Sequence, residues 1–242
     1  ELFLDEKGEK ISKSKGNGIT IEQWLKYASP ESLALYMYQN PKRAKKLYAD
    51  VVPNAVDEYL SYIDKFSGQD IQHRLLNPVW HVHNANPPKE KSVMPFSVLL
   101  NLVGTSNATD KNVLWKFIKK YKKNIEISNH PILDNLVECA LRYFKDIVKP
   151  KKKYRKPDEK EKIALQDLVK RLNDCNDQMD PEAIQTIVYS VGKENGYKEN
   201  LREWFKAIYE IIFGDQDGPR MGFFISFFGI KETIELINKR IK

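Results

Sequence analysis

The fold is decided by residues 131–148, which are Pro-Ile-Leu-Asp-Asn-Leu-Val-Glu-Cys-Ala-Leu-Arg-Tyr-Phe-Lys-Asp-Ile-Val. Apolar side chains recur in this stretch every three or four residues, which is the spacing of one face of an α-helix. The apolar positions are Leu133, Leu136, Val137, Ala140, Leu141, Phe144, Ile147 and Val148. The pattern predicts one long helix whose apolar face lies in a core.

Similar apolar stripes extend in both directions from this helix and cover most of the chain. Residues typical of helix starts precede several of them. These starts are the capping-box pair Thr20 and Gln23, Ser29 before Pro30, and Asp180 before Pro181. Residues 1–4 have the character of an extended strand instead. We therefore predict an all-α fold with a short strand and loop at its amino-terminal end.

Two irregular segments interrupt the helical pattern. Residues 77–95 contain four prolines and cannot form one continuous helix, because each proline removes an N–H donor and clashes with the preceding turn. Residues 149–157, Lys-Pro-Lys-Lys-Lys-Tyr-Arg-Lys-Pro, have the composition of a basic linker. These two segments are the natural places to divide the molecule.

Charge points to a polyanionic partner. The 242 residues include 40 Lys and Arg against 33 Asp and Glu, which gives a formal net charge of +7. An excess of this kind favours binding to phosphates through counterion release. Cys139 and Cys175 are far apart and belong to no Cys-x-x-Cys pair, which argues against a zinc site and a disulfide framework and fits a reducing cytosol. We therefore expect a cytoplasmic protein. We expect no membrane partner, because no apolar run approaches the roughly 18 residues needed to cross a bilayer.

The sharpest local signal is residues 10–18, Lys-Ile-Ser-Lys-Ser-Lys-Gly-Asn-Gly. Lysine ammonium groups, serine hydroxyls and a flexible glycine backbone can together surround a triphosphate. Such a cluster also occurs in ordinary solvated surface loops, so the composition alone leaves both interpretations open. A Walker A loop is excluded, because the sequence contains no Gly-x-x-x-x-Gly-Lys-Ser/Thr pattern.

The same loop resembles the KMSKS signature of class I aminoacyl-tRNA synthetases, in the KISKS form with Ile11 in place of methionine. Further stretches are similar to the region after that signature in class I lysyl-tRNA synthetases of bacterial type. These stretches are residues 18–25, 30–38, 41–47 and 214–222. The resemblance covers essentially the whole chain, although the middle is similar more in helical layout than in motifs. It identifies the chain as a carboxy-terminal fragment that starts just before this loop, which we call the lysine loop.

The resemblance implies a lysine–tRNA ligase that uses ATP, with Mg²⁺ in the intact enzyme. Lys10 and Lys13 would be catalytic, because they would neutralise the departing pyrophosphate. The implied ATP-binding residues are Lys10, Ile11, Ser12, Lys13 and Ser14, with Gly16 and Gly18 as hinges. The family also needs a HIGH-type motif and a Rossmann fold, and His81-Val82-His83-Asn84 is only a superficial echo of that motif. We therefore expect the fragment alone to be inactive and to bind no cofactor stably.

The resemblance also suggests three segments: a remnant of the catalytic domain at 1–19, a connecting region that contacts the tRNA stem at 20–88, and a helical anticodon-binding domain at 89–242. Basic clusters occur at 42–46, 116–123 and 149–156. The candidates for binding tRNA(Lys) are Lys42, Arg43, Lys45, Lys46, Trp204, Phe205 and Arg220. Trp204 and Phe205 lie on an apolar stripe, so core packing is the alternative for both.

Two alternatives to a monomeric lysine–tRNA ligase remain open at this point. One is the carboxy-terminal half of a glutamyl-tRNA synthetase, whose lysine loop more often has Arg where Ser14 stands. The other is a helical RNA-binding module without catalytic activity. The choice of lysine rests on the resemblance alone, because the amino-acid pocket lies outside this chain.

Overall fold

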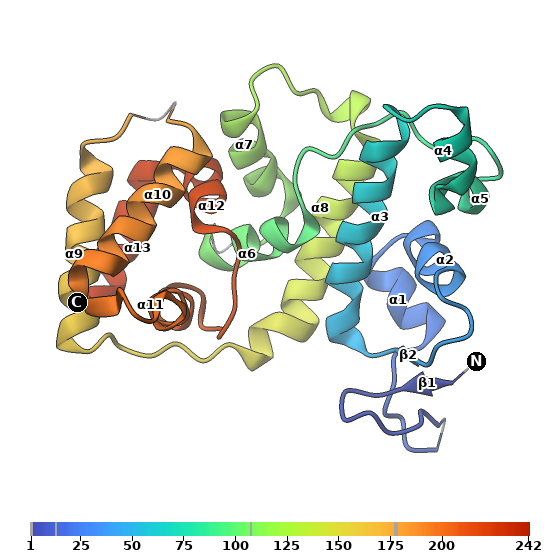
Figure 1. Cartoon of the computed structure of the whole chain (residues 1–242), viewed down its shortest axis with the longest axis horizontal. Coiled ribbons are helices and arrows are strands. Elements are labelled where there is room, and N and C mark those ends of the chain that lie inside the picture. The colour runs from blue at the N-terminus through green and yellow to red at the C-terminus, as the bar shows by residue number, and fades with distance from the viewer. Residues whose placement is uncertain (1, 13, 107, 177–178) are drawn as a thin grey trace. The chain divides into compact units, whose positions relative to one another are not determined.

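The predicted all-α fold is confirmed in the computed structural model, which describes residues 2–12, 14–106, 108–176 and 179–242. Helices make up most of these residues, and the described strands are the short β1 (Phe3–Leu4) and β2 (Lys45–Lys46). The chain divides into two compact units (Figure 1). Unit 1 comprises Glu1–Leu100 and Glu126–Ile147, and unit 2 comprises Asn101–Ile125 and Val148–Lys242.

These units do not follow the three segments suggested by the sequence. Unit 1 contains the lysine loop, the whole connecting region and the helix at 131–143. The long helix belongs to unit 1 because its apolar face packs on the first helix of the chain. Packing therefore joins segments that are distant in sequence, and the division into three functional segments stays a prediction.

Unit 1 is built largely from helices, and one of them contains most of residues 131–148. Its helices are α1 (Ile21–Tyr27), α2 (Pro30–Tyr38), α3 (Val52–Phe66), α4 (Ile71–Leu76), α5 (Pro78–Val82), the first half of α6 (Phe96–Ser106) and α8 (Pro131–Tyr143). Short 3₁₀ turns lie at Ala49–Val51 and Ile127–Asn129. The predicted break at 77–95 is confirmed, because α5 ends at Val82 and the next helix begins at Phe96.

The helix α8 carries the core of unit 1. Leu133, Leu136, Val137 and Ala140 are buried as predicted. Tyr143 is also buried; its ring meets Tyr27 edge-on at 5.5 Å between centroids, and its hydroxyl donates to the Ala49 carbonyl at 3.1 Å. After Tyr143 the helix widens into a π-helical turn, Phe144–Val148. The wider turn shifts the apolar face, so the last part of the predicted stripe is only partly buried.

The helix starts follow local rules in some places and distant contacts in others. The Thr20–Gln23 capping box is present with both of its hydrogen bonds, and Ser29 and Asp180 also cap their helices. By contrast, α8 is capped by Glu90, whose carboxylate accepts from the backbone N–H groups of Ile132 and Leu133 at 2.8 and 3.0 Å. The amino-terminal end of α6 is capped similarly by Asp57 of α3.

Unit 2 contains the second half of α6 and the remaining helices. These are α7 (Lys111–Tyr121), α9 (Glu159–Asn173), α10 (Pro181–Gly192), α11 (Leu201–Ile208), α12 (Met221–Phe228) and α13 (Ile230–Ile241). Two further π-helical turns lie at Lys193–Tyr197 and Tyr209–Phe213. Figure 1 shows α10 beside α12, and α9 beside α13, and both pairs are in contact.

A glycine allows the close approach of α10 and α12. A Cβ atom at position 222 would lie 2.1 Å from the Pro181 carbonyl oxygen and 2.6 Å from the Gln185 nitrogen. The Gln185 side chain accepts a hydrogen bond from the Gly222 N–H at 2.7 Å. Gly214, at the other end of the 214–222 stretch, has a φ of +67°, which favours glycine. Close packing explains the glycine at position 222, and the backbone angle explains the glycine at position 214.

The basic linker is packed along unit 2. The Arg155 guanidinium contacts the carboxylate of Glu161 with two bonds of 2.6 and 2.7 Å and that of Glu210 at 2.6 Å. The guanidinium carbon of Arg240 lies 3.9 Å from the centre of the Tyr154 ring. The charge of Arg155 is therefore used within the fold, whereas Lys149, Lys153 and Lys156 are exposed. In the described part of the chain, no helix is both long and apolar enough to span a bilayer.

Candidate functional site

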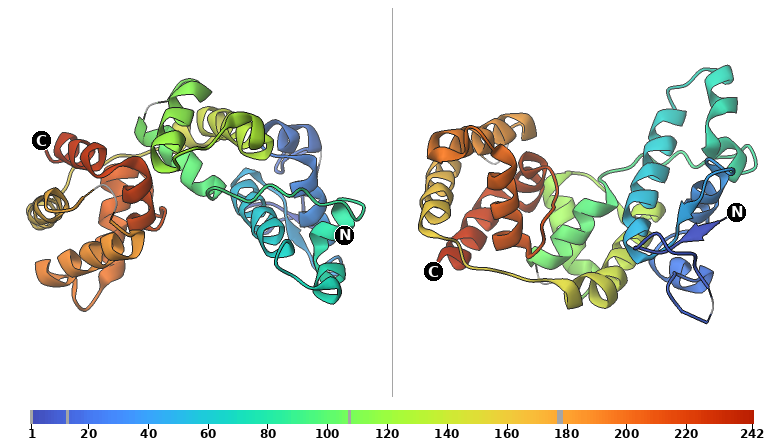
Figure 2. Two further views of the ribbon diagram at one scale, coloured as in Figure 1. Left: turned by 90° about the horizontal axis from the view of Figure 1, so that it is seen from above. Right: turned by 60° about the horizontal axis from the view of Figure 1, so that its bottom comes forward.

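The lysine loop projects beyond the helices of unit 1 and is held at its base by β1 and β2 (Figure 1; Figure 2, right). The two strands pair in parallel, with Phe3 opposite Lys45 and Leu4 opposite Lys46. The Leu47 N–H donates to the Leu4 carbonyl at 2.8 Å, and the Leu47 carbonyl accepts from the Ile19 N–H at 3.0 Å. Leu4 and Ile19, which flank the lysine loop, are therefore both bonded to Leu47, the residue directly after β2.

The first part of the loop is a tight turn organised by Asp5. One oxygen of its carboxylate accepts from the backbone N–H groups of Lys7 and Glu9 at 3.0 and 2.8 Å. The chain then returns alongside β1. Lys10 forms an isolated antiparallel β-bridge with Leu4, and the Ile11 N–H donates to the Phe3 carbonyl at 2.9 Å. The backbone at the start of the KISKS stretch is thereby fixed.

Asn17 connects the second part of the loop to the first. Its side-chain oxygen accepts from the Ser12 N–H at 3.1 Å, and its amide nitrogen donates to the second oxygen of Asp5 at 2.7 Å. The same nitrogen lies 3.4 Å from the Lys10 carbonyl. Asp5 is only 7% exposed. The hydrogen bond from Asn17, together with the Glu9 and Lys7 N–H groups, holds the pKa of the Asp5 carboxyl below its usual value.

The cationic side chains that the structure describes in the 10–18 stretch face solvent. Lys10 and Lys15 are exposed, and Lys15 lies 3.4 Å from the exposed Glu9 carboxylate. Lys13, the other predicted catalytic lysine, lies outside the described residues. The Ser12 hydroxyl accepts from the Lys15 N–H and lies 3.3 Å from the Ser14 hydroxyl. The loop thus presents the exposed positive charge of Lys10 and Lys15 on a backbone that is held by hydrogen bonds.

The two glycines suggested as hinges differ in their structural role. Gly16 has a φ of +58°, a backbone conformation that favours glycine. Gly18 has no such conformation, but a Cβ atom there would lie 2.7 Å from the Ile11 side chain. Gly18 is therefore suited to close packing against Ile11, which the sequence alone does not indicate.

The basic turn after α2 presents three of its four predicted RNA-binding side chains to solvent. Lys42, Arg43 and Lys46 are exposed. Lys45 is only 7% exposed, and its ammonium group donates to the Met37 carbonyl. Lys45 thus joins the turn to the carboxyl end of α2, a role that its position in a basic cluster does not reveal.

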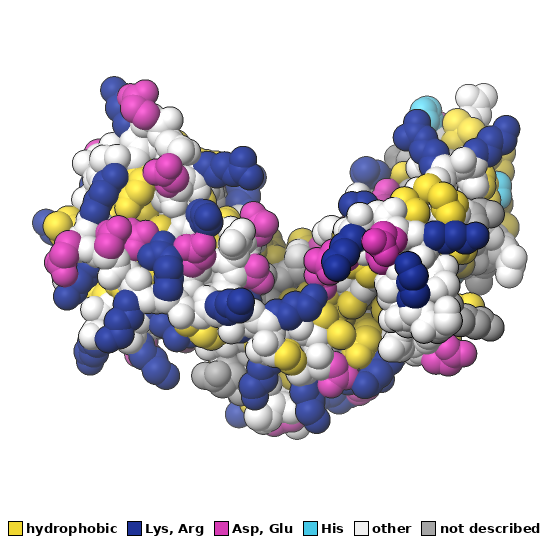
Figure 3. All heavy atoms as spheres, turned by 90° about the horizontal axis from the view of Figure 1, so that it is seen from below, with side chains coloured by type: hydrophobic (Ala, Val, Ile, Leu, Met, Phe, Trp, Pro, Cys, Tyr) yellow, Lys and Arg dark blue, Asp and Glu magenta, His cyan; other side chains and the backbone are white. Residues whose placement is uncertain are grey.

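The structure separates the residues predicted to contact the anticodon. Trp204 is fully buried, and its indole nitrogen donates to the Val188 carbonyl at 3.0 Å, so core packing describes its position. Phe205 is partly buried, with its ring centre 5.1 Å from that of Tyr189. Arg220 is 60% exposed and pairs with the Glu182 carboxylate at 2.5 Å. Basic side chains are spread among acidic ones on the face shown in Figure 3.

Other groups in unit 1 have structural partners. The His83 ring shares a 2.9 Å hydrogen bond with the Tyr59 hydroxyl, and His81 bonds the Leu75 carbonyl at 2.8 Å. These contacts agree with a structural role for both histidines. Across the described residues, no group of three or more His, Cys, Asp or Glu side chains could hold a metal ion.

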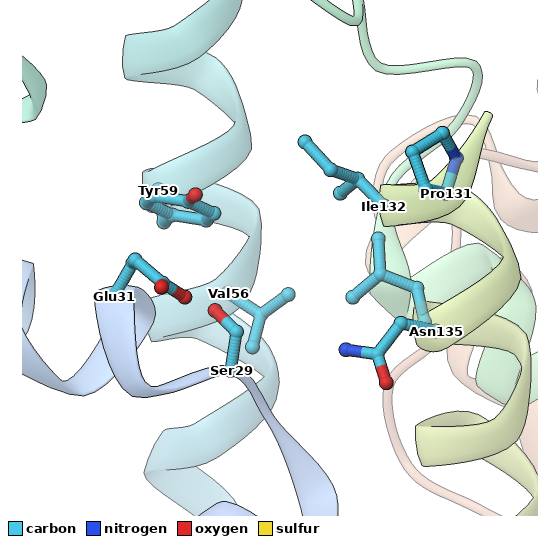
Figure 4. Close-up of a pocket in the computed structure, with 8 residues that line it drawn as sticks. Ser29, Glu31, Val56, Tyr59, Pro131, Ile132 and Asn135 are labelled. Carbon is cyan, nitrogen blue, oxygen red and sulfur yellow. The ribbon is translucent and has the colours of Figure 1, made fainter. Parts of the chain in front are cut away.

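A cavity of about 220 Å³ lies between α8 and the helices α2 and α3. Figure 4 shows Glu31, Ser29, Val56 and Tyr59 along one wall, with Pro131, Ile132 and Asn135 opposite. No residue of the lysine loop lines it. The charged residue in its lining is the acidic Glu31, which would repel a phosphate. The candidate nucleotide site is therefore the lysine loop and not this cavity.

Comparison with known proteins bears on this loop directly. A family described as tRNA synthetases class I (K) matches residues 1–86, which include the lysine loop and the basic turn. The lysine–tRNA ligase of Rickettsia peacockii (strain Rustic) is 49% identical over the whole chain, which covers 46% of that protein. That of Roseobacter denitrificans (strain ATCC 33942 / OCh 114) is 49% identical over 98% of the chain and is 45% covered. The chain belongs to the class I lysyl-tRNA synthetase family.

Membership of this family confirms the resemblance seen in the sequence, and the chain spans about half the length of the curated relatives it matches. Within the loop, the structure adds two residues that the motif did not single out as functional. In the sequence, Asn17 stands out only as a member of the 10–18 stretch, between the two glycines. Asp5 gave no signal, because a lone aspartate before a glycine turn is common on protein surfaces.

Proposed function

We propose that this chain is part of a lysine–tRNA ligase and supplies the lysine loop of its ATP site and part of its tRNA-binding surface. The observation that carries the proposal is a KISKS loop with Lys10 exposed on a backbone held by hydrogen bonds, in a chain 49% identical to a lysine–tRNA ligase over its whole length. In this reaction the lysine carboxylate attacks the α-phosphate of ATP, and pyrophosphate leaves. The resulting lysyl adenylate then transfers its lysyl group to the 3′ end of tRNA, and AMP is released.

The lysines of the loop would act on the leaving group. Negative charge grows on the pyrophosphate as the bond to the α-phosphate breaks, and positioned cations stabilise that charge more strongly than the charge of the ground state. We assign this role to Lys10 and Lys13. The Ile11 backbone and the hydroxyl groups of Ser12 and Ser14 would hold the loop in the conformation that binds ATP. Mg²⁺ would accompany ATP in the intact enzyme, and the described residues contain no group of three or more His, Cys, Asp or Glu side chains that could hold it.

The test compares the full-length protein with its Lys13→Ala and Lys10→Ala variants in lysine-dependent exchange of pyrophosphate into ATP. Loss of one cationic donor to the leaving group should lower the exchange rate by roughly 10²–10³-fold. Binding of tRNA should change little, because the loop acts in activation. A full-length protein that exchanges pyrophosphate with glutamate instead of lysine, or with neither, would refute the proposal. The 242-residue chain alone should form no adenylate.

The tRNA contact proposed for unit 1 rests on the three exposed cations of the basic turn, Lys42, Arg43 and Lys46. For unit 2, Arg220 and the partly exposed Phe205 are the remaining candidates to contact anticodon bases. Trp204 and Lys45 are buried, so we assign them to the fold instead. We further propose a monomer that acts in the cytoplasm without a membrane partner.

A further inference from the structure

We propose that Asn17 and Asp5 are paired positioning residues that set the lysine loop for catalysis. The inference rests on the proposed function, because it concerns how the loop lysines are held for the pyrophosphate. Neither residue is assigned a contact with substrate. Their action would be through the backbone of the KISKS stretch.

A single side-chain amide spans the start of the signature. The oxygen of Asn17 bonds the Ser12 N–H, and its nitrogen lies within 3.4 Å of the Lys10 carbonyl, so both residues next to Ile11 are held by one group. The bond from Asn17 to Asp5 is shorter, at 2.7 Å, and its acceptor is charged. Hydrogen bonds to charged groups are stronger than neutral ones. Asp5 therefore fixes Asn17, and Asn17 in turn fixes the backbone from which Lys10 extends.

The carboxylate of Asp5 also needs a neutral partner. It is nearly buried at the base of a loop rich in lysine, and its two oxygens accept two backbone N–H groups and the Asn17 amide. Because these three donors satisfy the carboxylate, it does not need a lysine ammonium group as its counter-ion. The pair thus keeps an anion in the loop without occupying a cation that ATP requires.

The complementarity of the pair provides a sharp test. Asn17→Asp places a second carboxylate opposite Asp5, and Asp5→Asn places two amide nitrogens face to face. The double variant Asp5→Asn/Asn17→Asp restores one donor and one acceptor. In it, the new amide at position 5 would donate to the new carboxylate at position 17, while the amide oxygen still accepts from Lys7 and Glu9. Glu9→Gln is the matched control, because it removes only an exposed ion pair in the same turn.

Two measurements on the full-length protein separate this inference from the proposed function. In lysine-dependent pyrophosphate exchange, each single variant should lose roughly tenfold or more in kcat, with KM for lysine unchanged, and the double variant should recover to within about threefold. The control should match the wild type. Rates of trypsin cleavage at the loop lysines should rise in the single variants and return in the double variant, whether or not the protein exchanges pyrophosphate.

Each outcome decides between the alternatives. Recovery in both measurements supports the pair as positioning residues. A double variant that is as impaired as the sum of the singles, or single variants with wild-type exchange, would overturn the inference. If the wild type shows no exchange, the proposed function fails on its own, and the cleavage rates still report whether Asn17 and Asp5 hold the loop.

Discussion

Replacement of Gly222 by alanine should destabilise unit 2, because the added Cβ atom has no space. It would lie 2.1 Å from the Pro181 carbonyl oxygen, a backbone atom that cannot rotate away. Overpacking of this kind costs about 1–3 kcal/mol or more, and loss of the 2.7 Å bond to Gln185 adds about 1 kcal/mol. Alanine is a better helix former than glycine by about 1 kcal/mol, which offsets part of this cost.

The net expectation for Gly222→Ala is a loss of roughly 1–3 kcal/mol, equivalent to a fall of about 4–12 °C in the Tm of a unit of this size. Thermal unfolding followed by circular dichroism measures it, with a urea titration as a second probe. Gly68→Ala is the matched control, because the nearest atom to its Cβ would be a carbonyl oxygen at an ordinary 3.9 Å. If Gly222→Ala unfolds at the wild-type temperature, the close approach of α10 and α12 does not require glycine, and the argument fails.

Two further predictions follow from the placement of charged groups. The bonds from Arg155 hold the pKa of the Glu161 carboxyl below its ordinary value of 4.5, so their stabilisation is complete above that pH and is lost as the pH falls through the lowered folded-state value. Glu161→Gln should therefore lower the free energy of unfolding by about 1–2 kcal/mol at neutral pH and by much less near pH ~3, as measured by urea unfolding at both. In unit 1, the variant Lys42→Ala/Arg43→Ala/Lys46→Ala should reduce the slope of log tRNA affinity against log salt by up to about 2–3, whereas Lys45→Met should leave the slope unchanged while lowering the unfolding temperature. An unchanged slope in the triple variant would exclude the basic turn as a phosphate-binding surface.

Local signals in the sequence predicted the helical fold well. The Thr20–Gln23 capping box and the apolar stripe of α8 depend on neighbours within a few residues, and both are present. The Glu90 cap on α8 could not be predicted, because the carboxylate and the N–H groups it accepts from are about 40 residues apart. The π-helical turn after Tyr143 was also missed, since the apolar spacing continues through it. Contacts between residues that are far apart in the sequence produce no periodic pattern in a single sequence.

The candidate site shows the same division between local pattern and distant contact. The KISKS motif identified the loop and its family, because the motif depends on residue types in a short run. Charge alone could not separate the lysines that face solvent from Lys45, which is buried against the end of α2. Apolar spacing likewise placed Trp204 and Phe205 on one stripe, although only Trp204 is fully buried.

The lysine loop combines two requirements that oppose each other. A site that stabilises charge on a leaving pyrophosphate needs cations that can move toward it, but a loop of like charges repels itself and loses order. In this chain the backbone is ordered by uncharged donors and one nearly buried carboxylate, centred on Asn17 and Asp5. The side chain of Lys10 then remains exposed. Order therefore comes from groups that carry no positive charge, and under the proposed function the positive charge of Lys10 would be available for the phosphate.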